Sequence, residues 1–310
     1  MIPILSWKDF TGDPEAFSEA LGEACRETGF FLLADHPIPS NLVANVFSAA
    51  DDFFALPQEE KAKLSISLNP HNRGWAQMGS ESLDDTSGQV DRKEAFNVGF
   101  DLSPDDPRVK AGEPFRGVNV WPELDGFRDT MLAYYNAVHA LSVRLHEAVA
   151  TDLDLPTGFF APHFTEPMAT LRILAYPPAS GEEGEIGAGA HTDYGSVTLL
   201  MTDGEGGLQV KPRGGDWTDV PHVPGAFVVN IGDCLMRWTN DIYVSTPHRV
   251  LPPKARRRSI AFFLDPNPDS IVQALPGTGA AKYPPITGAD YLRSRLDATY
   301  KPAPVPGAKT

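Results

Sequence analysis

The sequence predicts a mainly β protein with α-helical additions, in which the strands form an antiparallel sandwich or barrel. From about residue 170, short β-rich runs are separated by turn residues at close and regular intervals. No helical pattern alternates with these runs, which argues against βαβ units. Before residue 170 the apolar residues recur mostly at helical spacing, as in helices that buttress a β core. Because no linker separates the halves, we interpret residues 1–310 as a single domain.

The N-terminal part alternates strand and helix patterns. IPILSW (2–7) alternates weakly between apolar and polar residues and predicts a first strand. A helix is expected in 11–29, because Asp13 can cap it and Pro14 suits its first position. FFLLADH (30–36) is typical of a buried strand.

The rest of this N-terminal region, which extends to about residue 125, is less regular. A second helix is expected before Pro57 and a charged helical piece after it. We expect the irregular segment 70–100 to overhang the mouth of the β core, where loops often carry function. Two segments between residues 68 and 120 have strand-like apolar content: RGWAQMGSES (73–82) and DRKEAFNVGF (91–100).

A long helix at about 123–152 is expected to buttress the core. His139 and His146 lie on this helix, but no carboxylate stands beside them at ligand spacing. We therefore interpret both histidines as structural. The apolar face that would pack on the core consists of Phe127, Met131, Tyr135, Val138, Leu145 and Val149.

The β core is placed at about 168–270. It is followed by a C-terminal tail, 271–310, which we also expect near the mouth of the core. The β-rich runs are LRILAYPP (171–178), SVTLLMTD (196–203), GLQVKP (207–212), AFVVNIGD (226–233), YVSTPHRVL (243–251) and RRSIAFFLD (257–265). The stretch PPASGEEGEIGAG (177–189) is interpreted as a turn between the first two runs.

Composition excludes several classes of protein. Acidic residues exceed basic residues by 15, so nucleic acid and anionic membranes would repel the chain. The N-terminus has no signal-peptide pattern, and no window approaches the roughly 20 apolar residues of a membrane span. Cys25 and Cys234 are interpreted as buried thiols in a reducing compartment. We therefore expect a cytoplasmic protein whose partner is a small molecule, while its oligomeric state is left open.

The stretch HTDYGSVTLL (191–200) contains a candidate metal site. On an extended backbone His191 and Asp193 point to the same side, because side chains alternate along a strand. A His-x-Asp pair also arises by chance as surface residues before a strand, so a third ligand is required. His248 lies at the mouth of a later strand. Together the three residues would form the 2-His-1-carboxylate facial triad that holds non-haem iron.

A candidate anion receptor lies downstream of His248. On a strand, Arg257 and Ser259 share one face and Arg258 points the other way. A guanidinium can bind both oxygens of a carboxylate, and the hydroxyl adds a third hydrogen bond. The alternative interpretation is a basic surface cluster, which we assign to Lys254, Arg256 and Arg258 but not to Arg257, since the following residues IAFFL look buried.

These motifs resemble the iron(II)/2-oxoglutarate-dependent dioxygenases of the isopenicillin N synthase-like group. The ordered set, rather than any single motif, carries the resemblance, and it covers nearly the whole chain. The matching segments are IPILSW, GFFLLADHPIP, FFALPQEEK, RGWAQMGSES, RKEAFNVG, LRILAYPP, VPGAFVVNIGDCLMRWTND, STPHRV and KYPPITGADYLRSRL, besides HTD and the Arg-x-Ser of RRSIAFF.

The resemblance implies a double-stranded β-helix, or jelly-roll, core buttressed by N-terminal and central helices. It implies that Fe(II) is the cofactor and that 2-oxoglutarate and dioxygen are cosubstrates. Decarboxylation of 2-oxoglutarate would be coupled to oxidation, most often hydroxylation, of a small organic substrate. The implied metal ligands, which are also the catalytic residues, are His191, Asp193 and His248; the implied 2-oxoglutarate contacts are Arg257, Ser259 and Tyr176.

Some positions depart from the family pattern or leave alternatives open. Tyr176 is either a cosubstrate contact or a core tyrosine. Leu174 stands where plant members often have an asparagine, and His36 is given no catalytic role. Candidates to line the substrate pocket are Arg73, Trp75, Glu94 and Phe96, each of which has packing or surface solvation as its alternative.

Three rival functions remain. One is an oxidase or cyclase of the same fold that uses no 2-oxoglutarate, and another is an ethylene-forming enzyme. The third is a non-catalytic metal-binding jelly roll that acts as a sensor. The intact Asp193 carboxylate and the Arg257–Ser259 receptor argue against the sensor. The identity of the substrate is left open.

Overall fold

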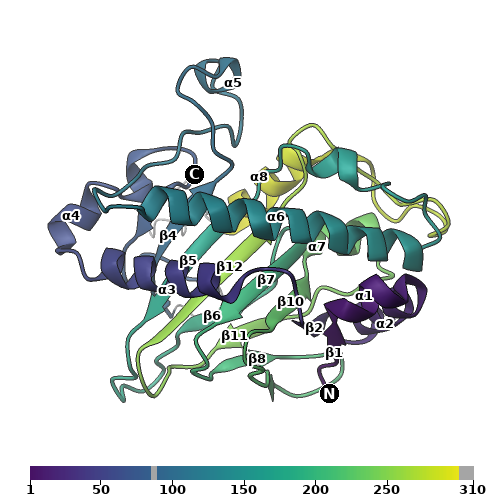
Figure 1. The fold of residues 1–310 in the computed structure, drawn as a ribbon, viewed down its shortest axis with the longest axis horizontal. Coiled ribbons are helices and arrows are strands. Elements are labelled where there is room, and N and C mark those ends of the chain that lie inside the picture. Colours follow the sequence, from purple (N-terminus) through teal and green to yellow (C-terminus); the bar gives the residue numbers. More distant parts are fainter. Residues whose placement is uncertain (85–88, 300–310) are drawn as a thin grey trace, which may run out of the picture.

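Two facing β-sheets form the centre of the computed structural model, which describes residues 1–84 and 89–299 (Figure 1). The larger sheet has eight strands in the order β1-β2-β10-β7-β12-β5-β4-β3. Its pairings are antiparallel except for the parallel pair β1–β2. The strands are β1 (Ile4–Ser6), β2 (Phe30–Ala34), β3 (Gly74–Ala76), β4 (Glu94–Gly99), β5 (Thr170–Tyr176), β7 (Val197–Thr202), β10 (Phe227–Ile231) and β12 (Arg257–Leu264).

The smaller sheet closes the other side of the core. It has four strands in the order β6-β11-β8-β9. Apolar residues of both sheets meet in one cluster, as expected of a jelly roll, and the predicted jelly-roll core is confirmed. The bounds are β6 (Ala188–His191), β8 (Leu208–Val210), β9 (Thr218–Asp219) and β11 (His248–Val250), and a separate pair consists of β13 (Ile271–Val272) and β14 (Ile286–Thr287).

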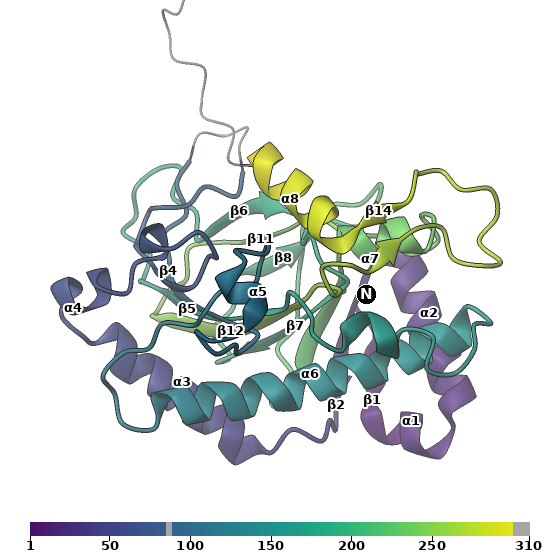
Figure 2. The same cartoon turned by 90° about the horizontal axis from the view of Figure 1, so that it is seen from above.

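Helices cover the outer face of the larger sheet. Figure 2 shows α3 and α6 on one side of this sheet and the smaller sheet on the other side. The long helix α6 contacts β12 and β7, which confirms the predicted buttressing helix. The helices are α1 (Trp7–Gly12), α2 (Pro14–Glu27), α3 (Ser40–Phe54), α4 (Gln58–Ala62), α5 (Pro107–Lys110), α6 (Phe127–Asp152), α7 (Asp233–Trp238) and α8 (Gly288–Thr299), with short 3-10 turns at Ile66–Leu68 and Ala161–Phe164.

The period-two alternation of side chains separates two environments across the larger sheet. On β12, Ile260 and Phe262 belong to the core beneath the helices, whereas Ala261 belongs to the cluster between the sheets. Arg257 and Ser259 share the inward face with Ala261, as predicted. A single strand therefore contributes both to the hydrophobic core and to the interior of the jelly roll.

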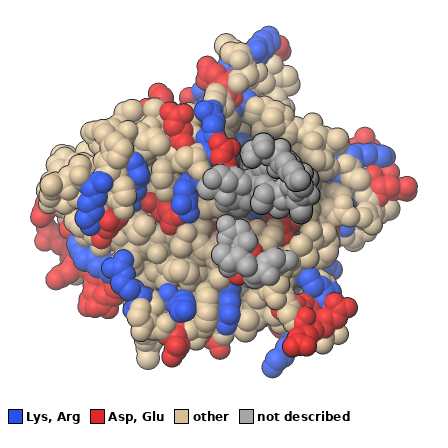
Figure 3. All heavy atoms as spheres, turned by 180° about the vertical axis from the view of Figure 1, so that it is seen from behind, with Lys and Arg blue, Asp and Glu red and all other residues tan. Residues whose placement is uncertain are grey.

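Several local predictions hold. The side chain of Asp13 accepts a hydrogen bond from the backbone N–H of Ala16 at 3.1 Å, and Pro14 is the first residue of α2. Cys25 and Cys234 are free and buried. Among the described residues, no helix combines the length and the apolar character that a bilayer crossing requires. On the face drawn in Figure 3, acidic and basic side chains are interspersed, so the net negative charge is not gathered into one patch there.

Other elements differ from expectation. The short helices α1 and α7 are not anticipated, because six residues give too few turns for a periodic pattern to emerge. β6 lies partly within the stretch interpreted as a turn. The expected tail contains β13, β14 and α8, while its residues 300–310 and residues 85–88 of the irregular segment lie outside the described residues.

The histidines of α6 are structural, as interpreted. His139 Nε2 lies 2.8 Å from the carbonyl of Phe164. His146 is 1% exposed; its Nδ1–H donates to the carbonyl of Ser142 at 2.7 Å and its Nε2 accepts from the hydroxyl of Ser196 at 2.7 Å. Burial lowers the pKa of His146 to about 4. The hydrogen bond that Nε2 accepts from Ser196 requires the neutral imidazole.

His146 is expected to make the protein less stable in mild acid. Between pH 6.5 and about 4 the unfolded chain binds a proton at this position that the folded protein excludes, so stability falls as pH falls through this window. The loss amounts to about 3 kcal/mol. Urea unfolding at pH 7.5 and pH 4.5 should show a smaller difference in His146→Gln than in wild type. The exposed His222, changed to Gln, should keep the wild-type difference.

Candidate active site

Three predicted ligands meet where the smaller sheet approaches the larger one. His191 is the last residue of β6 and His248 is the first residue of β11, and the two are directly paired across the antiparallel ladder. Their rings lie 4.3 Å apart between centroids. Asp193 follows two residues after His191, in the loop that leads to β7. The strand pairing thus brings together residues that are 57 positions apart in sequence.

The distances fit a single metal ion. Asp193 Oδ1 lies 3.8 Å from His191 Nε2 and 3.7 Å from His248 Nε2. All three donor atoms lie within 4.8 Å of one another, and among the described residues this is the group that could hold a metal ion. Two imidazoles and one carboxylate on one side of a site form the donor set of non-haem iron(II).

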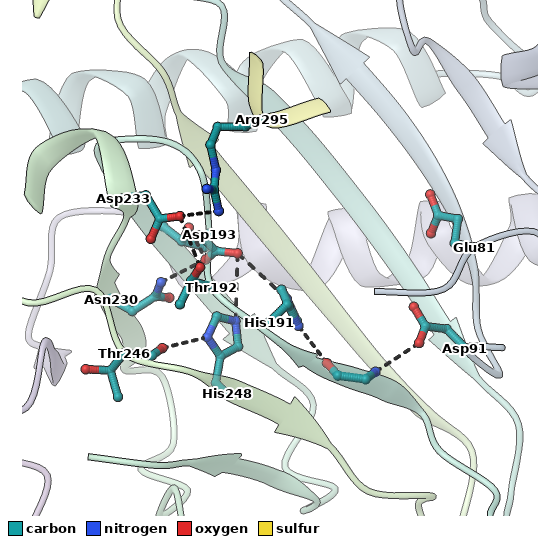
Figure 4. Close-up of polar contacts among 12 residues, drawn as sticks. Glu81, Asp91, His191, Thr192, Asp193, Asn230, Asp233, Thr246, His248 and Arg295 are labelled. Carbon is teal, nitrogen blue, oxygen red and sulfur yellow. Dashed lines mark hydrogen bonds and ion pairs between the residues drawn. The ribbon is translucent and has the colours of Figure 1, made fainter. Parts of the chain in front are cut away.

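Hydrogen bonds orient both imidazoles (Figure 4). The Nδ1–H of His191 donates to the carbonyl of Gly189 at 2.7 Å, and the Nδ1–H of His248 donates to the carbonyl of Thr246 at 3.3 Å. Because a carbonyl can only accept, each Nδ1 carries the proton and each Nε2 keeps its lone pair for a metal. Burial, and then the nearness of His248, holds the pKa of His191 well below its ordinary value, so this imidazole is neutral.

The third ligand is oriented in the same way. Oδ2 of Asp193 accepts hydrogen bonds from the Thr198 hydroxyl at 2.5 Å and from the Asn230 amide at 2.8 Å, which leaves Oδ1 facing the imidazoles. Burial alone would raise the pKa of Asp193, but the two histidines and these two hydrogen bonds outweigh it and lower the pKa. The carboxylate is therefore ionised and ready to bind a cation.

A further layer of contacts supports the ligand loop. The Gly189 N–H donates to Asp91 Oδ1 at 2.9 Å, so Asp91 holds the residue to which His191 is bound. The Thr192 hydroxyl donates to Asp233, and Asp233 in turn pairs with Arg295 of α8 at 2.7 Å. Figure 4 shows this second chain of contacts on the side of the triad opposite Asp91. Such supporting contacts keep metal ligands in register.

The triad opens into a cavity of about 240 Å³ between the sheets. Strands β5 and β12 run along its length, and alternate residues of each face inward at roughly 7 Å intervals. The inward residues of β12 continue into the following loop and are Arg257, Ser259, Ala261, Phe263 and Asp265; those of β5 and the segment before it are Tyr176, Leu174, Arg172, Thr170 and Met168.

One end of this cavity is built around Arg257. Arg257 is 1% exposed, its Nη1 lies 3.4 Å from Ser259 Oγ, and its guanidinium stacks 4.8 Å from the centre of the Tyr176 ring. Its Nε has no hydrogen-bond partner, and it makes no ion pair with any of residues 1–84 and 89–299. A buried cation without a counter-ion is costly, so this arrangement points to an anionic ligand.

Arg258 behaves as the neighbouring surface residue that was predicted. It faces the opposite side of β12, where it pairs with Asp51 of α3 and with Asp203. Its side chain is 29% exposed and lies over the ring of Phe47 at 5.5 Å. The alternation of β12 therefore places one arginine in the cavity and the next against the helices.

Of the four residues proposed to line the substrate pocket, Arg73 alone does so. Trp75 and Phe96 are buried in the core beneath the helices, and the Glu94 carboxylate accepts a hydrogen bond from the Trp75 indole at 2.9 Å. These three assignments were wrong. β3 and β4 turn those side chains away from the cavity, and Asn97 occupies the inward face of β4.

The sequence interpretation missed two residues that contact the metal ligand Asp193. Thr198 and Asn230 are buried polar residues in otherwise apolar strands, β7 and β10. A buried polar side chain in an apolar run requires a partner, and that signal was available in VTLLMT and FVVNI. The identity of the partner was not available. Asp193 lies 37 residues before Asn230, and although it lies only five residues before Thr198, no periodic pattern links that loop residue to the strand.

Comparison with known proteins agrees with this geometry. The N-terminal model for non-haem dioxygenases, described as acting in morphine synthesis, matches residues 2–124, and the model of the 2OG-Fe(II) oxygenase superfamily matches residues 166–266. The chain is 39% identical to a 2-oxoglutarate-Fe(II) type oxidoreductase of Emericella nidulans over 315 residues, which cover 96% of this chain and 90% of the relative.

Two other relatives bear on the chemistry. A proline hydroxylase of Petromyces alliaceus is 34% identical over 333 residues, covering 96% of this chain and 98% of the relative. The crystal structure of a full-length Neurospora crassa protein in complex with alpha-KG and thymine superimposes with a TM-score of 0.86 at 32% identity, covering 96% of this chain and 97% of that one.

Proposed function

We propose that this chain, which belongs to the 2OG-Fe(II) oxygenase superfamily and is a 2-oxoglutarate-dependent dioxygenase, hydroxylates a small organic molecule. The observation that carries the proposal is one cavity that holds both three converging metal donors and the unpaired guanidinium of Arg257. A dianionic cosubstrate that chelates the metal with one end and binds an arginine with the other fits this arrangement.

In this proposal His191, Asp193 and His248 hold iron(II). The hydrogen bonds that orient the three ligands use the Nδ1 atom of each histidine and Oδ2 of Asp193. The Nε2 atom of each histidine and Oδ1 of Asp193 are therefore left to bind the metal. Iron(II) supplies the redox chemistry that couples decarboxylation of 2-oxoglutarate to oxidation of the substrate. The protein contributes ligand geometry, and no side chain has to act as a general base.

Arg257 and Ser259 bind the distal carboxylate of 2-oxoglutarate. The guanidinium offers two parallel N–H donors, and the Ser259 hydroxyl adds a third. Tyr176 contributes its ring face, against which the guanidinium is stacked. The apolar side chains of Leu174 and Val228 line the same cavity and exclude water, which strengthens the charge pairing.

The size of the cavity and the named relatives favour a small substrate. The cavity of about 240 Å³, which Thr170 and Asp265 also line, is too small for a macromolecule. The names of the relatives refer to proline hydroxylation and to a bound thymine, both small polar molecules. Insertion of oxygen is the proposed outcome, in preference to desaturation, ring closure or ethylene formation.

The decisive experiment is a substrate screen. Protein loaded with iron(II) is incubated with 2-oxoglutarate, dioxygen and candidate small molecules, and succinate release is measured together with product mass. We expect a true substrate to stimulate succinate release and to gain one oxygen atom. Substrate oxidation at full rate without 2-oxoglutarate, or a product that lacks the added oxygen, would overturn the proposed reaction.

A further inference from the structure

The half of the cavity opposite Arg257 contains a second buried guanidinium without a counter-ion, that of Arg73. Arg73 is 4% exposed and lines the cavity. Its Nη1 donates to the carbonyl of His71 at 3.0 Å, and its Nε has no partner. No carboxylate in the described part of the chain pairs with it. Charged groups are rarely buried alone, and when they line a cavity a ligand is the usual counter-ion.

Local structure holds this guanidinium in place. The Asn69 side chain accepts hydrogen bonds from the N–H groups of His71 (3.0 Å) and Arg73 (3.3 Å) and donates to the Arg73 carbonyl (2.8 Å). Asn72 lies in the left-handed region with φ 56°. The guanidinium lies against Gly99, where a β-carbon would collide with it. A strained turn that fixes a buried cation is typical of a binding site.

The Arg73 guanidinium is positively charged at neutral pH, although its surroundings lower its pKa. Burial is the main reason that the pKa of Arg73 is lowered to about 10. Tyr135 acts to raise this pKa, and the buried Arg116 acts to lower it. Arg73 therefore stays charged at neutral pH. The Glu81 carboxylate in the same cavity is already bound, since it pairs with Arg172 and lies 3.4 Å from Lys93 Nζ.

A second carboxyl group, Asp265, belongs to the iron side of the cavity. The carbonyl of the preceding Leu264 accepts from the N–H of Ser196 in the loop after the metal ligands. Burial and the nearby Asp193 raise the pKa of Asp265 to about 7. Among the described residues Asp265 makes no ion pair with Arg73, so it does not serve as the counter-ion.

The surroundings of Arg73 fit the body of an organic acid. Phe115 lines the cavity with its backbone in the left-handed region, φ 60°, which is unusual for an aromatic residue. Met168, also in the cavity, is 3% exposed. Asn97 Oδ1 is buried without a donor, while its amide N–H donates to the Asn72 carbonyl at 3.2 Å. The pocket thus offers a cation, an apolar wall and one hydrogen-bond acceptor.

We propose that this half of the cavity binds the primary substrate as a small organic carboxylate, with its carboxylate on Arg73 and its apolar body against Phe115 and Met168. Asn97 Oδ1 accepts a hydrogen bond from a donor group on the same molecule. This inference rests on the proposed function, because it names the substrate class of the same site. The acid is held at the end of the cavity remote from Arg257, so its body extends toward the metal.

The test measures binding, so it does not depend on turnover. Full-length protein is loaded without dioxygen with iron(II) and saturating 2-oxoglutarate, which occupies Arg257. Hexanoate, benzoate and phenylacetate are titrated by calorimetry against their neutral amides. We expect at least one acid to bind roughly thirty-fold or more tightly than its amide, and Arg73→Gln to abolish this preference. Iron and 2-oxoglutarate binding should not change in this variant.

The matched control is Arg128→Gln, which removes a 54% exposed arginine on α6 and should keep the preference. If Arg73→Gln does not fold, Asn97→Asp provides the second variant, since it places a carboxylate on the same strand face as Gly99, where the guanidinium lies. That variant should fold and lose acid binding. Equal binding of all acids and amides to wild type, or an acid preference that survives in folded Arg73→Gln, would refute the inference. Failure of the proposed function has a different signature, namely no 2-oxoglutarate-dependent succinate release with any substrate.

Discussion

Replacement of His248 by alanine is expected to abolish iron(II) binding and turnover while leaving the protein folded. His248 Nε2 is one of three donor atoms that converge on the candidate metal position, 3.7 Å from Asp193 Oδ1. Loss of a residue that merely supports a ligand typically lowers metal affinity 10–100-fold, so loss of the ligand itself should lower it by more than about 100-fold. Anaerobic iron titration, circular dichroism and succinate release measure the three quantities.

The fold should tolerate this change. His248 lies at the edge of the cavity, with its ring 5.5 Å from the ring of Phe30, and alanine is compatible with its place at the start of β11. The exposed His222, changed to alanine, is the control and should bind iron normally. A His248→Ala protein that binds iron with wild-type affinity, or turns over at the wild-type rate, would remove this residue from the triad.

How far the sequence predicts the fold depends on how different the two faces of each strand are. In β12 the cavity face carries Arg257 and Ser259 while the opposite face carries the apolar Ile260 and Phe262. The predicted orientation of Arg257 and Arg258 agrees with the structure. In β4 both faces are buried. Hydrophobicity therefore cannot tell which face meets the cavity, and Phe96 was assigned to the wrong side.

The metal ligands could be predicted from the sequence because few combinations of residues bind non-haem iron. The residues of the substrate half of the cavity could not be predicted in this way. Two histidines and an aspartate at suitable positions are the donor set of a non-haem iron site and fit few other functions. The C-terminal tail was expected near the mouth of the core, and Leu292 and Leu296 of α8 do line the cavity, but no sequence pattern singled out these two residues. Arg73 was named as a candidate, but its lack of a counter-ion is a property of the folded chain, since it depends on which carboxylates come near it.

The second large effect is expected for Arg257→Gln, which should greatly raise the 2-oxoglutarate concentration needed for turnover. The substitution removes a charge-assisted bidentate contact from a site where the guanidinium is 1% exposed. Truncating one partner of a buried charge pair costs on the order of 2–5 kcal/mol. This corresponds to roughly thirty-fold to several-thousand-fold in affinity. Iron binding should stay near normal, because the hydrogen bonds that orient the three metal ligands do not involve Arg257.

Arg258→Gln separates loss of the carboxylate contact from loss of an arginine on β12. Its side chain pairs with Asp51 and Asp203 outside the cavity, so the variant can lose some stability but should keep the wild-type dependence on 2-oxoglutarate. Succinate formation and dioxygen uptake are measured for both variants over a range of 2-oxoglutarate concentrations. If Arg257→Gln weakens the organic substrate instead, and wild type consumes dioxygen at full rate without 2-oxoglutarate, then Arg257 is a substrate receptor. The selective pattern, with iron retained and the cosubstrate weakened, is the result that assigns Arg257 to 2-oxoglutarate.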